Sequence, residues 1–371
     1  MFKKWVNNFF LVVFFIFICI GIFNYIIDPY GIYNFNINLP KIMQEDKIRL
    51  IKAIKIKDIK PASIILGTSR AETGYNPENT YFLQPSFNAG NSGASMYEER
   101  KYFEYALYQG NLKQVLLVID YIMFDALQQR HVLDFDTYFN QSIFFKYKYL
   151  FSLKTLRDSI RTIKQNKKDY IAYLYNGQRE HNYKLKYIMD HGGYSKVFYD
   201  KNYYINYLPE YKYKDTHKLS FKDFNIILNL CYKYNIKLTI IFGPSHILQW
   251  EALDRYIGYK NWLKWKKDIV LDVYDLARKY NQKPFKVVDF AIYNKWTSEK
   301  IPTNLQDNMK YYWESSHYKN CLGELVLNYL KYRKPKGLGS ELNIDNIDQH
   351  LNNLKIQRKK YIKYFDIKKI K

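Results

Sequence analysis

Cysteine is scarce in this chain, with three residues among 371. Cys19 lies within an apolar N-terminal run, whereas Cys231 and Cys321 are far apart in the sequence. Two isolated cysteines exclude a disulfide-stapled scaffold and a cysteine-rich metal site. A single bridge between Cys231 and Cys321 is compatible with a location outside the cytosol, but we expect two buried free thiols.

Acidic residues are also few, because 35 Asp and Glu stand against 58 Lys and Arg and leave a formal charge of +23. Such a charge suits anionic lipid, anionic polysaccharide or nucleic acid, and it also arises when lysines are spread over solvated faces. The sequence has neither zinc-ligand spacing nor the aromatic motif of an RNA-binding sheet, so we expect no nucleic-acid partner. The densest basic run lies near the C-terminus and contains Arg358, Lys359, Lys360, Lys363, Lys368 and Lys369.

Charge is absent between Lys4 and Asp28, and residues 9–27 form a run rich in Phe, Ile and Val. Its length of about 19 residues fits a helix that spans a membrane. Lys3 and Lys4 precede the run, which predicts residues 1–8 in the cytoplasm and the body of the chain outside. A cleaved signal peptide is the alternative, but the run is longer than a usual signal core and no small-residue cleavage site follows it. We therefore predict a single-pass anchor in a bacterial inner membrane, with a periplasmic or extracellular body in contact with membrane lipid.

Strand and helix patterns alternate over residues 61–334. Short buried strands are predicted at Ala62–Leu66, Val115–Ile119, Lys237–Phe242 and Phe285–Phe290. Helices are predicted at Tyr97–Tyr108, Phe221–Tyr234, Trp262–Tyr280 and Tyr318–Tyr332, the first of them with Ser95 and Glu98 at capping-box spacing. This alternation predicts an α/β domain with a mostly parallel sheet and helices on both faces.

Three segments interrupt or flank this pattern. Residues 28–60 begin with the turn Asp28-Pro29-Tyr30-Gly31 and form a juxtamembrane segment. Residues 131–220 are rich in Tyr, Lys and Asn and only weakly helical from 153 to 174, which indicates an insertion or lid over the carboxyl edge of the sheet. After Lys334, residues 335–371 are expected to leave the domain as a polar and then basic tail.

Ser69 follows the first predicted strand directly, in the run Gly67-Thr68-Ser69. Gly67 permits a tight turn at the end of the strand, where the ligands of such sheets bind. Backbone N–H groups at the start of a following helix can stabilise an oxyanion. Small residues from Phe87 to Ser95 allow close backbone approach, and the N–H of Gly93 is a candidate second donor.

Glu314 precedes His317 by three residues, immediately before the last predicted helix. A carboxylate at this spacing can fold back and accept the imidazole Nδ1–H, so that Nε2 is oriented to take a proton from a serine hydroxyl. A Glu and a His at this spacing also occur by chance on surface turns. The pair becomes informative because Ser69, Gly93 and His317 follow one another in this order along the chain.

That order resembles the SGNH hydrolase superfamily, whose Ser, Gly, Asn and His come from four separate blocks on a flavodoxin-like sheet. Gly67-Thr68-Ser69 is similar to the family's Gly-Asp-Ser, residues 88–93 to its Asn-x-x-x-Ser-Gly, and Glu314-Ser315-Ser316-His317 to its Asp-x-x-His. The resemblance implies a three-layer flavodoxin-like α/β fold, to which the sequence patterns above add a helical insertion and one N-terminal transmembrane helix. It implies Ser69 as nucleophile, His317 as base and Glu314 as the orienting carboxylate, with no metal and no organic cofactor.

One block departs from the family pattern, because Asp120 stands where the family has an asparagine that donates to the oxyanion. An ionised Asp120 would repel an oxyanion, and Asn91 or Asn88 are candidates to supply the missing donor. If Asp120 merely fills the position, Asp120→Asn should not reduce activity. The candidates for contacts to substrate are Arg70, Asn88, Asp120 and His246. For His246, a structural histidine that caps the strand end is the favoured interpretation.

The variant pattern is similar to membrane-anchored SGNH-like proteins of surface-polysaccharide acylation, such as those of alginate O-acetylation and teichoic-acid D-alanylation. The stretch Asn24-Tyr25-x-x-Asp28-Pro29-Tyr30-Gly31 is part of this resemblance. It implies a serine esterase or O-acyltransferase that acts on a cell-surface glycan, beside a multi-spanning membrane acyltransferase. The alternative is a catalytically inactive binding or assembly partner of the same machinery, which Asp120 favours.

Overall fold

The computed structural model describes residues 2–33, 45–166, 172–180, 182–200, 208–305 and 307–365. The chain divides into two compact units, of which unit 1 comprises Met1–Asp58 and Leu133–Leu174. Unit 2 comprises Ile59–Val132 and Tyr175–Lys371. Part of the predicted juxtamembrane segment, at 34–44, and the last part of the predicted basic tail, including Lys368 and Lys369, lie outside the described residues.

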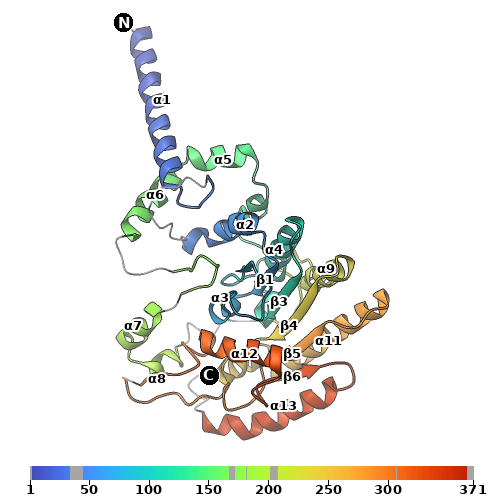
Figure 1. Ribbon diagram of the computed structural model, residues 1–371. Coiled ribbons are helices and arrows are strands. Elements are labelled where there is room, and N and C mark those ends of the chain that lie inside the picture. Colours follow the sequence, from blue (N-terminus) through green and yellow to red (C-terminus); the bar gives the residue numbers. More distant parts are fainter. Residues whose placement is uncertain are drawn as a thin grey trace. The chain divides into compact units, whose positions relative to one another are not determined.

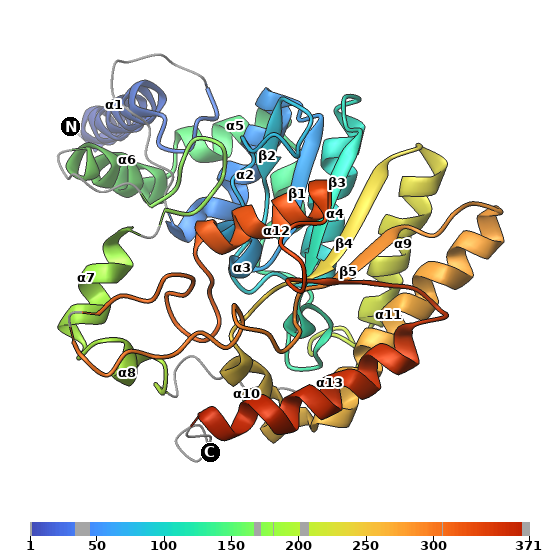
Figure 2. The ribbon, with the colours of Figure 1, turned by 60° about the horizontal axis from the view of Figure 1, so that its bottom comes forward.

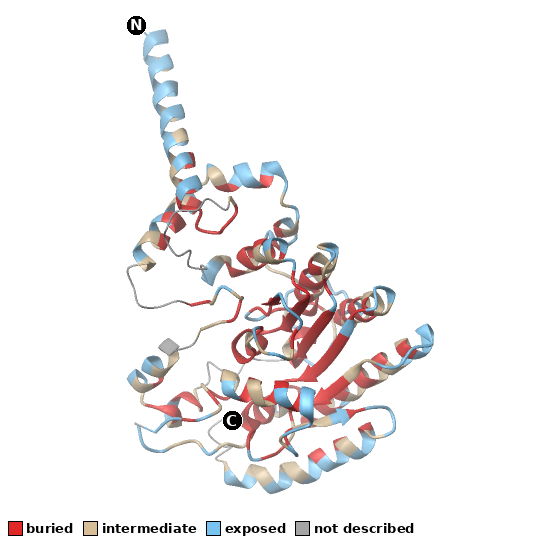
Figure 3. Cartoon of the chain, in the orientation of Figure 1, coloured by how far each residue is buried: buried red, intermediate tan, exposed pale blue. Residues whose placement is uncertain are grey.

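Unit 1 is helical. The helix α1 (Phe2–Ile27), drawn in blue in Figure 1, is long and apolar enough to cross a membrane. Figure 3 shows that it is exposed along most of its length. The other helices of this unit are α2 (Ile48–Ile59), α5 (Ile143–Leu150) and α6 (Leu153–Gln165), with short 3-10 turns at Glu45–Lys47 and Phe135–Phe139. The end of α1 packs against α5 and α6, which come from the first half of the predicted insertion.

Unit 2 contains one six-stranded sheet in the order β2-β1-β3-β4-β5-β6. Its strands are β1 (Ser63–Gly67), β2 (Ser86–Asn88), β3 (Gln114–Ile119), β4 (Lys237–Phe242), β5 (Lys286–Asp289) and β6 (Ser340–Leu342). The first five in this order are parallel, and β6 is antiparallel to β5. The predicted α/β class with a mostly parallel sheet is confirmed, and the four predicted strands all belong to this sheet.

Helices cover both faces of the sheet, as Figure 2 shows. One face carries α4 (Met96–Tyr108), α9 (Ser220–Lys233) and α11 (Tyr259–Tyr280), and the other carries α3 (Ser69–Gly74) and α12 (Asn320–Tyr332). Every residue of β1 and β3 is buried, as expected for strands that are covered on both faces. The unit also contains α7 (Asn182–Asp190), α8 (Tyr194–Val197), α10 (Ile247–Ile257) and α13 (Ile347–Tyr361), with 3-10 turns at Tyr121–Phe124 and Ile362–Tyr364.

The predicted tail is wrong for residues up to 365. Instead of leaving the domain, the chain adds β6 to the sheet and then packs α13 against α11. Arg358, taken as part of a basic run, donates hydrogen bonds to Glu251 and Asp254 of α10. Leu351 and Leu354 bury the apolar side of α13, a pattern that the surrounding lysines obscure in the sequence.

The predicted insertion is divided between the two units. Its second half contributes α7 and α8 to unit 2, where Ile188, Tyr194 and Phe198 join a core cluster with Tyr312 and Tyr318. The cysteine prediction holds in part, since all three are free thiols, but Cys321 is exposed and only Cys231 is buried in unit 2.

A buried charge cluster links three elements of unit 2. Lys266 of α11 lies 2.7 Å from the Asp289 carboxylate at the end of β5, and neither side chain is exposed. His350 of α13 bonds the same carboxylate, and the Lys266 ammonium also donates to the carbonyl of Ala291. Burial lowers the pKa of Lys266 against the attraction of Asp289, while Lys266 and His350 lower the pKa of Asp289 in spite of its burial.

Asp289→Ala is predicted to lower the free energy of unfolding by about 3–5 kcal/mol, because it leaves the Lys266 ammonium buried without a carboxylate. Lys266→Met should cost less, since Asp289 keeps its hydrogen bond to His350. Denaturant unfolding of the detergent-solubilised chain measures both. Equal losses, or a larger loss for Lys266→Met, would contradict this account of the cluster.

Candidate active site

A tight turn carries Ser69 from the end of β1 to the start of α3. Gly67 has φ +145°, and a Cβ there would lie 2.5 Å from the Val118 carbonyl oxygen, so a larger residue does not fit. Thr68 is the N-cap of α3, and its side chain accepts a hydrogen bond from the N–H of Arg70. Ser69 is the first helical residue, and an N–H in the first turn has no partner within its own helix. The turn therefore presents a hydroxyl and a backbone donor from the same residue.

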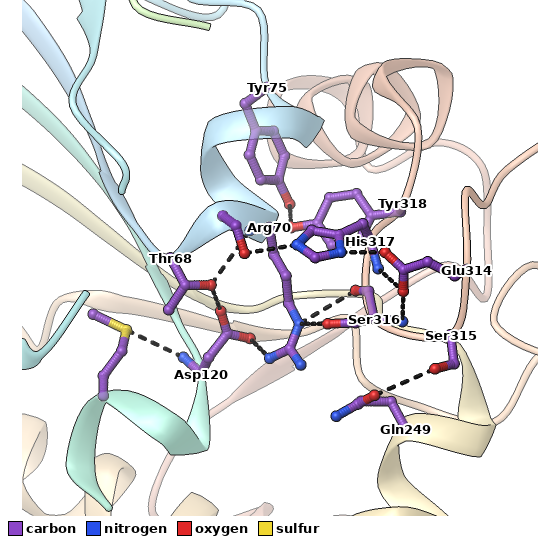
Figure 4. Close-up of polar contacts among 12 residues, drawn as sticks. Thr68, Arg70, Tyr75, Asp120, Gln249, Glu314, Ser315, Ser316, His317 and Tyr318 are labelled. Atoms are coloured by element: carbon purple, nitrogen blue, oxygen red, sulfur yellow. Dashed lines mark hydrogen bonds and ion pairs between the residues drawn. The ribbon is translucent and has the colours of Figure 1, made fainter. Parts of the chain in front are cut away.

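His317 lies opposite this turn and bonds Ser69 directly. The distance from His317 Nε2 to Ser69 Oγ is 2.6 Å. His317 Nδ1 bonds Glu314 Oε1, so Nδ1 carries the proton and Nε2 accepts the one on Ser69 (Figure 4). The structure thus brings together the three residues that the sequence placed in a candidate triad.

The packing of α12 on α3 sets this distance. His317 lies three residues before the start of α12, Ser69 is the first residue of α3, and these two helices are in contact. A Cβ at Gly323 of α12 would lie 1.7 Å from the carbonyl oxygen of Gly74 in α3, so only glycine permits so close an approach. The close packing of these helices holds base and nucleophile within hydrogen-bond reach.

Glu314 is held in its own tight turn. Its Oε2 accepts hydrogen bonds from the backbone N–H groups of Ser316 at 2.7 Å and His317 at 3.2 Å. The side chain is 1% exposed, and Lys184 of α7 places its ammonium 3.5 Å from Oε1. Burial alone would favour the neutral acid, but the interactions of the carboxylate with His317 and with the Lys184 ammonium lower the pKa of Glu314 to about 2. Glu314 is therefore a carboxylate at neutral pH.

The pKa of His317 is lowered. Burial is the main cause, the Lys184 and Arg70 cations act in the same direction, and the Glu314 carboxylate opposes them. The imidazole is consequently neutral at physiological pH, which is the form that can accept the proton of Ser69.

Asp120 is paired with a cation. This corrects the expectation that its charge would act directly on an oxyanion. Arg70 Nη1 donates to Asp120 Oδ1 at 2.6 Å, and the Thr68 hydroxyl donates to Oδ2. Arg70 Nε also donates to the carbonyl and hydroxyl oxygens of Ser316, beside His317 (Figure 4). The Arg70 cation offsets the charge of Asp120, and the pair ties the turn of Ser69 to the turn of His317.

The two asparagines of the second block are structural, which contradicts their predicted roles. Asn88 is fully buried and donates to the carbonyl oxygens of Ala71 and Tyr75 in and after α3. Asn91 is also fully buried, and its amide donates to the carbonyl of Ala89. Both side chains are buried, and both donors of the Asn88 amide are used within the fold, so neither asparagine is exposed to a substrate.

Gly93 remains a candidate backbone donor. It is exposed, has φ +62° and has nothing within 4 Å of the position of a Cβ. Its loop is fixed to the turn of Ser69, because the N–H of Asn91 donates to the carbonyl of Gly67 at 2.9 Å. Ser69 and Gly93 are thus the oxyanion candidates that remain.

His246 is the N-cap of α10 and is fully buried. Its Nδ1 accepts from the N–H of Leu248, and its Nε2 bonds the carbonyl of Glu299. Burial lowers the pKa of His246 to about 4, so the ring is neutral. The structural interpretation of His246 is correct, and the predicted substrate contact is wrong.

Sequence patterns missed two supports of the site. Lys184 lies in a stretch where Lys and Tyr recur without periodicity, so nothing marked it as a neighbour of Glu314. Glu99 of α4 is fully buried and accepts a hydrogen bond from the N–H of Gly67. The sequence shows Glu99 only as one charged residue of a helix and does not indicate that it is buried beside the turn of Ser69. Within the described ranges, no group of three or more His, Cys, Asp or Glu side chains is arranged to hold a metal ion.

No protein-family model matches the chain, and no curated protein is similar enough to it to count as a match.

Lys184→Met is predicted to raise the pKa of His317, because it removes a cation that disfavours the imidazolium. NMR titration of the His317 ring measures this shift, with Lys186→Met as the control, since Lys186 lies on the same helix but pairs with Asp190 in solvent. An unchanged or lowered pKa of His317 in Lys184→Met would show that Lys184 does not act on the ring.

Asp120→Asn is predicted to destabilise the fold by about 1.5–3 kcal/mol, because it removes the anion that Arg70 binds in a nearly buried site. Adding Arg70→Gln removes the unpaired cation and should restore part of that loss. Thermal unfolding of the single and double variants tests this, and a neutral single variant would mean that Asp120 only fills space.

Proposed function

We propose that this chain is a membrane-anchored serine enzyme of the SGNH type, which transfers or hydrolyses acyl groups on a cell-surface glycan outside the cytoplasm. The observation that carries the proposal is the 2.6 Å contact between Ser69 Oγ and His317 Nε2, with Glu314 on the other ring nitrogen. This constellation activates a serine hydroxyl on unrelated folds, and it is recognised by geometry rather than by sequence position.

The sheet supports the family proposal. Its parallel strands follow the order β2-β1-β3-β4-β5, which is the order of flavodoxin-like sheets. Ser69 directly follows the end of β1, at the edge where ligands of such sheets bind. The antiparallel β6 extends this arrangement at one edge without changing the position of the site.

The chemistry follows from these contacts. Ser69 Oγ attacks the acyl carbonyl while His317 Nε2 takes the hydroxyl proton, and Glu314 stabilises the imidazolium that forms. The N–H groups of Ser69 and Gly93 would hold the oxyanion of the tetrahedral intermediate. The imidazolium then protonates the departing alcohol and leaves an acyl group on Ser69. An acceptor hydroxyl, from a sugar or from water, gives its proton to His317 and releases Ser69.

The net charge of +23 supports an anionic or lipid-adjacent glycan as the substrate class. The apolar α1 supports an anchor, and the lysines before it support a cytoplasmic N-terminus. A multi-spanning membrane acyltransferase is the partner that the resemblance suggests as acyl donor. None of these steps calls for a metal or an organic cofactor.

A non-catalytic partner of a polysaccharide-acylation machine is the second candidate. It is favoured by Asp120, because the side chain at this position accepts hydrogen bonds from Arg70 and Thr68 and donates none to an oxyanion. The two candidates differ in whether Ser69 reacts.

Hydrolysis of a chromogenic acetyl ester, with and without added glycan, tests the catalytic proposal. Ser69→Ala and His317→Ala should reduce the rate to background, and Glu314→Gln should lose on the order of 10⁴-fold, as in well-studied triads. His191→Ala is the control, because its ring is exposed on the loop after α7 and stacks on Tyr187. Activity that survives Ser69→Ala would exclude this mechanism.

The proposed orientation has its own test. A reporter that is active only outside the cytoplasm, fused after Lys371, should be active, because Lys3 and Lys4 hold the other end of α1 inside. An inactive fusion, together with an active cytoplasmic reporter at the same position, would reverse the orientation.

A further inference from the structure

We propose that α5 and the start of α6 lie in the interfacial layer of the lipid bilayer, so that unit 1 binds the membrane along its side as well as through α1. The inference rests on the membrane anchor proposed above. It assigns a lipid surface as the ligand of one defined face, which we call the lipid-facing stripe: Ile143, Phe144, Tyr147, Phe151 and Leu153.

The lipid-facing stripe is apolar and exposed. The exposed fractions are 62% for Ile143, 80% for Phe144, 51% for Tyr147, 40% for Phe151 and 69% for Leu153. Phe144, Tyr147 and Phe151 follow helical spacing and share one side, while Phe145 and Tyr149 point inward and are buried. A contiguous patch of large apolar side chains on a surface marks an interaction site rather than a solvated face.

The stripe adjoins the candidate membrane helix. A Cβ at Gly21 of α1 would lie 2.7 Å from the ring of Phe151, so the absence of a side chain at Gly21 admits that ring. Asn24 is fully buried, its amide donates to the carbonyl oxygens of Leu150 and Ser152, and it accepts from the Ser159 hydroxyl. The end of α5 and the start of α6 are therefore fixed at the level of Gly21 and Asn24.

The length of α1 indicates how deep in the bilayer Gly21 and Asn24 lie. The uncharged run from Trp5 to Ile27 would rise about 34 Å as a helix, against a hydrocarbon core of about 30 Å. If these residues fill the core, its outer boundary lies within about one turn of Asp28. Gly21 and Asn24 are then at or inside that boundary, and Figure 1 shows α5 running across the end of α1 rather than along it. A transverse helix at this level lies in the plane of the interface.

The composition of α5 suits this position. Lys146 and Lys148 lie on α5 and Lys154 on α6, all exposed beside the aromatic side chains. Aromatic side chains are enriched at the membrane interface, and lysines there extend their ammonium groups towards the lipid headgroups. Both features are typical of amphipathic helices that lie on a membrane surface.

The motif after α1 has a role in this arrangement. Asp28 accepts hydrogen bonds from the N–H groups of Ile32 and Tyr33, and the Tyr33 hydroxyl donates to the carbonyl of Lys146 in α5. Tyr30 bonds Asp158 of α6 and packs its ring against Tyr149. The stretch from Asn24 to Tyr33 therefore holds α5 and α6 in place against the end of α1.

Depth-dependent fluorescence quenching of the full chain in lipid nanodiscs tests the inference. All variants carry Cys321→Ser, since Cys321 is exposed and Cys231 is buried. The first variant keeps Cys19 as the labelling site. The second carries Cys19→Ser and Phe144→Cys and is labelled at position 144. The matched control labels Tyr108→Cys in the same background, because Tyr108 is 85% exposed at the end of α4 in unit 2.

Nanodiscs carry a spin label either near the headgroup, at carbon 5 of the acyl chain, or deep in the core, at carbon 12. The probe at position 144 should lose most of its fluorescence to the shallow label and less to the deep one. The probe at Cys19, about 14 Å along the helix from Asp28, should show the opposite order. The probe at position 108 gives the reference level of quenching for an exposed site outside unit 1.

The outcomes separate the inference from the anchor beneath it. Quenching at Cys19 without quenching at position 144 overturns the lipid contact of α5 and leaves the anchor intact. Stronger quenching of position 144 by the deep label than by the shallow one also overturns it, because α5 would not be interfacial. No quenching at Cys19 shows that α1 is not in lipid, and the proposed anchor then fails together with the inference.

Discussion

The buried carboxylate of Glu314 is the interaction on which the candidate site depends. It bonds two backbone N–H groups of its own turn, the Nδ1 of His317 and the ammonium of Lys184, so four donors from two segments converge on it. These contacts keep it ionised in a buried position and fix both the tautomer and the direction of the imidazole. The hydroxyl of Ser69 lies within hydrogen-bond distance of Nε2 because α3 and α12 approach each other closely at Gly74 and Gly323.

A second ion pair, Arg70 with Asp120, joins the same two turns from the other side of Ser69. In an enzyme of the proposed SGNH type, an amide at the position of Asp120 would donate to the oxyanion, whereas the Asp120 carboxylate accepts hydrogen bonds from Arg70 and Thr68. Asp120 therefore positions Arg70 and does not donate a hydrogen bond to substrate. The oxyanion donors are then left to backbone N–H groups. The lack of an amide donor at position 120 is the physical reason to keep a non-catalytic binding role as the second candidate function.

Features with strong local patterns were predictable from the sequence. The strand predicted at Val115–Ile119 is a continuous apolar run. Gly67-Thr68-Ser69 and Glu314 to His317 are short motifs whose geometry is local. Features that depend on distant partners were not. The short β2 and β6 carry little hydrophobic pattern, α13 hides its apolar side among lysines, and Lys184, Asn88 and Asn91 acquire their roles only through tertiary contacts. The same holds for Asn24, whose buried amide has a purpose only once α5 and α6 pack against α1.

The central claim is that His317 makes Ser69 a nucleophile, and covalent labelling with a fluorophosphonate tests it most directly. Such a probe reacts with an activated serine hydroxyl and needs no knowledge of the glycan or the acyl donor. The account predicts one label per folded chain, located by mass spectrometry on Ser69 and lost in His317→Ala. A folded wild-type chain that takes up no label at Ser69 would contradict it and would leave the non-catalytic partner as the function.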